Sequence, residues 1–79
     1  MSNLEKYDEA FRDSLKLNGD IALDELEYRK IKLWDSIGHM TLISSLENAF
    51  DIEIETNDVI NFSSYKKGKQ ILKKYGVEI

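Results

Sequence analysis

The fold of this chain is decided by residues 34–50, WDSIGHMTLISSLENAF, where a polar linker gives way to a periodic apolar segment. On a helical wheel of about 100° per residue, one arc collects the apolar residues of a core-facing stripe, which are Leu42, Ile43, Leu46, Ala49 and Phe50. The same wheel places Ile37 and Met40 on the opposite side, among polar residues. We therefore expect a helix over residues 37–50 with one buried face and a small apolar docking surface on the other.

Ser36 stands directly before this predicted helix and has two interpretations. Serine is a preferred helix N-cap, and Asp35 would serve equally well in that position. The alternative is that Ser36 is a chemical handle, exposed at the start of the helix. The residues that follow it bear on this choice.

These residues have a characteristic order and spacing: Asp35-Ser36-Ile37 opens the helix, Leu42, Leu46, Glu47 and Phe50 lie within it, and Asp51-Ile52-Glu53-Ile54 follows. The pattern resembles acyl carrier proteins, in which an Asp-Ser-Leu motif holds the serine that receives 4′-phosphopantetheine. The resemblance covers nearly the whole chain. It implies a non-catalytic carrier whose acyl cargo rides as a thioester on an arm attached to Ser36, with Asp35 as part of the motif that the modifying transferase recognises. It implies no catalytic residue and no metal site within this chain, although Asp35 could contribute to the metal site of the transferase.

The physical setting agrees with this implication, because the N–H groups and the positive dipole end of a helix N-terminus favour a phosphodiester. The partners implied are a phosphopantetheinyl transferase and acyl- or aminoacyl-activating and transferase enzymes. We expect Ile37, Met40 and Glu47 to face them. Residues 35–61 contain six acids and no Lys or Arg, which suggests partners with basic patches. A solvated acidic face without a partner is the alternative.

The chain also departs from fatty acid biosynthesis carriers. Gly38 and Thr41 stand where those carriers commonly have acids, and Ser44 stands where they often have a larger apolar residue. These differences favour a specialised lipid, polysaccharide or secondary-metabolite pathway. Two alternatives stay open: an aminoacyl or peptidyl carrier using the same serine, and a helical interaction module in which Ser36 only caps its helix.

Composition limits the remaining classes of protein. The 79 residues, of which 42% are hydrophobic, predict one domain spanning residues 1–79. There is no cysteine and only one histidine, which excludes a disulfide framework and a His-cluster metal site. The net charge of −4 disfavours nucleic acid as a partner. No signal peptide or apolar membrane span is present in the sequence, so we expect a cytoplasmic monomer that does not bind membranes.

The rest of the chain predicts three further helices. Apolar spacing indicates a helix over residues 4–15, capped by Ser2 or Asn3 and ended by Asn18-Gly19. Residues 20–35 form a long loop, and residues 50–56 an extended connector. A short helix from about Thr56 or Asn57 to Ile60, started by Asn57 or Asp58, precedes a last helix that follows Ser63-Ser64 and ends at Gly76. The expected fold is an all-α, four-helix bundle with three long helices, one short helix and a long loop between the first two, as in acyl carrier proteins.

Several side chains have competing interpretations. Carriers can shelter an acyl chain, and the resemblance implies a lining of Leu42, Leu46, Phe50, Ile54, Ile60, Phe62, Ile71 and Leu72, although any helical core would use the same residues. Gly68 in the last helix suggests either close approach of a neighbouring helix or room for something held in the core. We expect His39 to be partly buried and bonded to the long loop, not a general base for Ser36, and Trp34 to anchor that loop.

Overall fold

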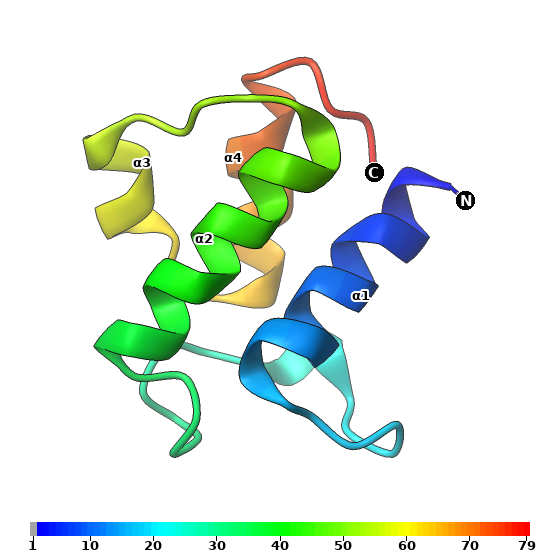
Figure 1. Cartoon of the computed structure of the whole chain (residues 1–79), viewed down its shortest axis with the longest axis vertical. Helices are drawn as coiled ribbons and strands as arrows, with labels where there is room; N and C mark the ends of the chain where they lie inside the picture. Colours follow the sequence, from blue (N-terminus) through cyan, green and yellow to red (C-terminus); the bar gives the residue numbers. More distant parts are fainter. Residues whose placement is uncertain (1) are drawn as a thin grey trace.

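The computed structural model describes residues 2–79. Its helices follow the order α1 (Asn3–Leu15), a 3-10 turn η1 (Leu23–Glu25), α2 (Ser36–Phe50), α3 (Thr56–Asn61) and α4 (Tyr65–Lys73) (Figure 1). No β-strand occurs within the described residues, so the all-α prediction is confirmed. The radius of gyration is 11.3 Å, close to the ~12 Å expected of a compact domain of this length.

The first helix begins as predicted and ends earlier. Ser2 caps α1 through a capping box with Glu5. The Asn18-Gly19 pair does not end the helix, because Lys16 already takes the left-handed conformation (φ 52°) and donates its N–H to the Arg12 carbonyl. α1 then packs along α2 (Figure 1), and the Ser14 hydroxyl donates to the Ser45 hydroxyl across this interface at 2.9 Å.

The long loop between α1 and α2 is tied to the turn between α3 and α4. Glu27 and Ser64 form an isolated antiparallel β-bridge. In it the backbone N–H of Tyr28 donates to the Ser63 carbonyl at 2.8 Å, and the backbone N–H of Tyr65 donates to the Leu26 carbonyl at 3.0 Å. Trp34, at the end of the loop, is fully buried. The prediction that Trp34 anchors the loop is confirmed.

The last two helices differ in detail from the prediction. Glu55 precedes α3 without a side-chain cap, and Asp58 lies inside the helix, buried, instead of starting it. Ser64 caps α4 by accepting the Lys67 N–H. α4 ends at Lys73, and the chain then turns through Gly76, whose φ is 82°.

An aromatic cluster from α1, α4, the long loop and the residue that follows α3 forms the centre of the core. Phe11 contacts the rings of Tyr7, Trp34, Phe62 and Tyr65 at centroid distances of 5.0–6.1 Å. A β-carbon added at Gly68 would lie 2.1 Å from the Phe62 ring and 2.3 Å from the Tyr7 hydroxyl. Close approach of neighbouring side chains, and not an empty space, therefore explains the glycine in α4.

Candidate functional site

The start of α2 is capped by Asp35 and not by Ser36. Asp35 has an extended backbone, and its Oδ1 accepts the Gly38 N–H at 2.9 Å. Ser36 is the first residue of the helix and its side chain is exposed. Since the aspartate supplies the cap, the Ser36 hydroxyl is not needed to satisfy the first N–H groups of α2.

Two side chains of the long loop converge on the Ser36 hydroxyl. Arg29 donates from Nη2 to Ser36 Oγ at 3.1 Å, and the Tyr28 hydroxyl lies 3.3 Å from the same oxygen. The Arg29 guanidinium also lies 5.4 Å from the centre of the Tyr28 ring, within the range of a cation–π contact. A cation and a phenol therefore flank the serine at the positive end of the helix.

The backbone of the loop fixes this arrangement. Arg29 adopts a left-handed conformation with φ 68°, and its N–H donates to the Trp34 carbonyl at 3.0 Å. Tyr28 is held by its backbone bond to Ser63. The segment that carries Tyr28 and Arg29 is thus attached both to the buried tryptophan and to the turn before α4.

The Tyr28 phenol differs from the other tyrosines in its acidity. The hydrogen bond with Ser36, followed by the nearby Arg29 guanidinium, lowers the pKa of Tyr28 below its ordinary value. Burial raises the pKa of Tyr7 and Tyr65, and a hydrogen bond to Asp58 raises that of Tyr75. Tyr28 is therefore expected to ionise before the other three.

Sequence reasoning missed Tyr28 and Arg29 as site residues. The available signal was the basic run Arg29, Lys30 and Lys32 immediately before the Asp35-Ser36 motif. This run places positive charge beside residues 35–61, which contain no Lys or Arg.

His39 is committed to the interior. Its Nδ1 accepts the indole N–H of Trp34 at 2.9 Å, and its Nε2 donates to the Val59 carbonyl at 2.8 Å. Both ring nitrogens are used, so the imidazole links the loop, α2 and α3 and has no nitrogen to offer Ser36 as a general base. The prediction of a partly buried histidine bonded to the loop is confirmed.

Gly38 allows the loop to pass close to the first turn of α2. A β-carbon at this position would lie 2.1 Å from the Leu33 carbonyl oxygen and 3.1 Å from Leu15 Cδ2. A larger residue requires the loop backbone to move, which explains why an acidic side chain is not accommodated here.

The two faces predicted for α2 are present. Leu42, Ile43 and Leu46 are buried, whereas Ile37 is 79% and Met40 56% exposed. Glu47, predicted to face partners, instead accepts the Ile54 N–H through Oε2 at 2.8 Å and so holds the connector against α2. Ile37 and Met40 remain as the outward apolar side chains of α2 near Ser36.

The lining proposed for a sheltered acyl chain is corrected at one position. Ile60 is 72% exposed and therefore faces solvent, not an interior space. The others lie in the core or pack against it as partly buried residues: Leu42, Leu46, Phe50, Ile54, Phe62, Ile71 and Leu72.

The acidic middle segment is also less exposed than its composition suggested. Asp58 is 5% exposed and accepts from Lys74 at 2.7 Å and from the Tyr75 hydroxyl. These hydrogen bonds, first that of Lys74 and then that of Tyr75, lower the pKa of the Asp58 carboxyl. Asp58 therefore joins α3 to the turn after α4 and does not contribute to an outward acidic face.

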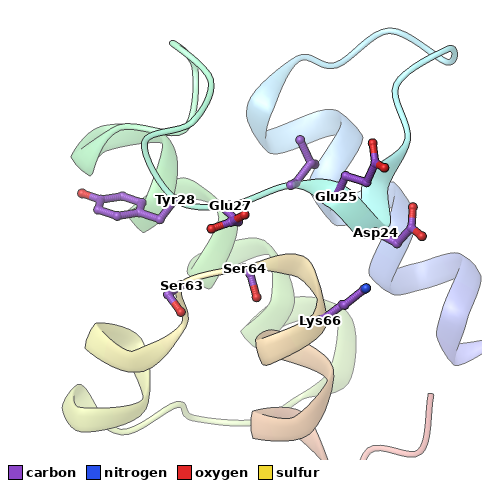
Figure 2. A pocket seen from close by; sticks show the side chains of 8 residues that line it. Asp24, Glu25, Glu27, Tyr28, Ser63, Ser64 and Lys66 are labelled. Carbon is purple, nitrogen blue, oxygen red and sulfur yellow. The ribbon is translucent and has the colours of Figure 1, made fainter.

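A hollow of about 640 Å³ lies between the long loop and the start of α4 (Figure 2). Asp24, Glu25 and Glu27 contribute acids to it, and Lys66 contributes a base. Tyr28 belongs to its rim, with its ring directed away from Asp24 and Glu25 (Figure 2). Within residues 2–79 no group of three or more His, Cys, Asp or Glu side chains is arranged to hold a metal ion.

Comparisons with known proteins add no relative. Family models, curated proteins and solved structures were each searched, and none matches this chain. Among the described helices, none combines the length and the apolar character that crossing a membrane requires.

Proposed function

We propose that this chain is a non-catalytic acyl carrier protein, loaded with 4′-phosphopantetheine on Ser36. The observation that carries the proposal is the position of Ser36. It is exposed as the first residue of α2, and its hydroxyl does not cap the helix because Asp35 does. The order of the helices, with a long loop before the helix that carries the serine and a short helix before the last, supports the same family.

The residues at this position fit a permanently attached phosphodiester. The Ser36 side chain is exposed, so the arm can extend into solvent. The positive end of α2 and the Arg29 guanidinium both favour the negative charge that the group introduces.

Attachment requires chemistry that a separate transferase supplies. Ser36 Oγ attacks the phosphorus of coenzyme A that bears the pantetheine, and a new O–P bond forms. The P–O bond to the adenosine bisphosphate breaks, and the departing phosphate keeps the electron pair. The hydroxyl proton passes to a base of the transferase or to solvent, because His39 has both nitrogens engaged. Asp35, which caps α2 through Oδ1, is the neighbouring residue that we expect the transferase to recognise.

The arm ends in a thiol, on which acyl groups ride as thioesters. Tethering raises the effective concentration of the acyl group at each partner enzyme. Ile37 and Met40, exposed within the first turns of α2, are the apolar contacts that we expect partners to use. Gly38 and Thr41 leave this face without the acids of fatty acid carriers, which favours a specialised pathway.

Intact mass spectrometry after co-expression with a broad-specificity phosphopantetheinyl transferase tests the proposal. We expect one arm's worth of added mass on the wild type and on Ser64→Ala, and none on Ser36→Ala. No addition to the wild type, under conditions that load a control carrier, would refute the carrier function.

The cargo needs a separate measurement. The loaded protein is offered acyl adenylates and aminoacyl adenylates with their activating enzymes, and the thioesters are identified by mass. Acceptance of amino acids alone would replace the acyl carrier with an aminoacyl carrier.

A further inference from the structure

The contacts of Arg29 go beyond what attachment at Ser36 requires. The transferase needs an exposed hydroxyl, yet here Arg29 Nη2 donates to that hydroxyl at 3.1 Å and the Tyr28 hydroxyl approaches it to 3.3 Å. Both side chains come from a loop more than six residues away along the chain, and a folded backbone brings them there.

The Arg29 guanidinium is suited to an anion bonded to Ser36 Oγ. A planar guanidinium offers several N–H donors in a fixed fork that matches the oxygens of a phosphate group. In the unloaded protein the hydrogen bond that this fork makes to Ser36 goes to a neutral hydroxyl. A phosphodiester on the same oxygen would supply two non-bridging oxygens and a full negative charge within the reach of the same donors.

The loop holds Arg29 in place before any ligand is present. Its left-handed backbone is secured by the bond from its N–H to the Trp34 carbonyl, and Trp34 is itself fully buried. The guanidinium also lies against the Tyr28 ring. Because the backbone is already ordered, binding an anion costs less conformational entropy than it would on a flexible loop.

We propose that Arg29, assisted by the Tyr28 hydroxyl, binds the non-bridging oxygens of the phosphodiester on Ser36 and holds the base of the arm against the loop. No covalent bond changes in this step, since the donors exchange a hydroxyl oxygen for phosphate oxygens. Arg29 is thus a positioning residue for the arm. The inference rests on the proposed carrier function and specifies how that function is organised at Ser36.

Nuclear magnetic resonance of the loaded protein tests the inference. The chain has two arginines, Arg12 and Arg29, so their side-chain N–H signals are readily distinguished by substitution. Arg12 donates to the Asn18 carbonyl at 2.8 Å in the turn after α1 and serves as the internal reference. On loading from coenzyme A, we expect the Arg29 Nε–H signal to shift and the Arg12 signal to keep its position.

The 31P NMR signal of the phosphodiester reports the same contact from the phosphate side. In loaded Arg29→Gln, the phosphodiester signal should move toward its position in the urea-unfolded loaded protein. Loaded Lys30→Gln, which removes an exposed cation next along the loop, should keep the wild-type signal. Glutamine keeps the β- and γ-carbons of the arginine stem and removes the guanidinium, so it adds no strain to the left-handed backbone.

The possible results distinguish a failure of the role of Arg29 from a failure of the carrier function. Absence of the arm's mass from the wild type would defeat both. An arm present by mass, with the Arg29 signal unmoved, would overturn the role of Arg29 and leave the carrier intact. Should Arg29→Gln load or fold poorly, the wild-type arginine spectrum decides alone.

Discussion

Helices α2 and α4 both begin with serines, but the two starts are built differently. In α4, Ser64 is the cap and its hydroxyl accepts the Lys67 N–H at 3.0 Å. In α2, Asp35 is the cap, and Ser36 follows it as the first helical residue. The difference shows that the Ser64 hydroxyl caps its helix, whereas the Ser36 hydroxyl takes no part in capping α2.

The two serines also differ in their exposure to solvent and in their partners. Ser64 is half-buried and paired with Glu27 in the bridge that fixes the long loop. Ser36 is exposed, with a guanidinium and a phenol as its side-chain partners. The start of α4 therefore helps to hold the fold together, whereas the Ser36 side chain at the start of α2 is exposed to solvent.

The largest effect is expected away from both starts, at the buried face of α2. Leu46 is fully buried, and Leu46→Ala should lower the free energy of unfolding by ~2–5 kcal/mol because it leaves a cavity in the core. Urea denaturation measures this loss. An unchanged midpoint would mean that α2 is not held by its buried face, which would weaken the contrast between its interior and its exposed start.

Acid should next weaken the contact between Asp58 in α3 and the turn after α4. The pKa of Asp58 is lowered in the folded state by its bonds with Lys74 and Tyr75, so the group stabilises the fold above its unfolded pKa, about 4. That contribution is lost as the pH falls through the folded pKa. Thermal melts from pH 7 to pH 3 should show a smaller drop in Tm for Asp58→Asn than for the wild type. Equal drops would mean that the bonds of Asp58 with Lys74 and Tyr75 do not stabilise the fold.

The two serines themselves provide the direct test of the comparison. Ser64→Ala removes a cap and should cost ~1 kcal/mol of stability, as such substitutions typically do. Ser36→Ala removes an exposed hydroxyl and should change stability by less than about 0.5 kcal/mol. Equal losses in the two variants would assign Ser36 a structural role.

The smallest effect on folding is expected at the outward side chains of α2. Ile37→Ala and Met40→Ala should leave the Tm nearly unchanged, because these side chains are 79% and 56% exposed. Both should nevertheless slow loading or turnover by partner enzymes. A large loss of stability in either variant would place that side chain in the core.

Periodicity and capping chemistry predicted much of this framework. The buried face of α2 and the starts of α1 and α4 follow from local signals that the structure retains. The failures involve conformations that the sequence does not mark. Lys16 and Arg29 are left-handed without being glycine, a conformation that costs roughly 1–2 kcal/mol and that only the surrounding contacts can stabilise.

This explains why half of the candidate site was missed. Ser36 and Asp35 are recognisable from a short motif, but Arg29 reaches Ser36 only because its backbone is left-handed and bonded to Trp34. Similarly, the helical wheel predicts that Glu47 faces partners, because the wheel gives the direction of the side chain but does not show that Glu47 accepts the Ile54 N–H of the connector. Tertiary hydrogen bonds decided both cases.

Locating the arm by fragmentation mass spectrometry tests the central claim most directly. The chain has seven serines, and Ser63 and Ser64 offer a second helix start with the same residue type. The account predicts the added mass on the peptide that contains Ser36, and on that residue alone. An arm found on Ser63, Ser64 or any other serine, or no arm after exposure to an active transferase, would contradict it.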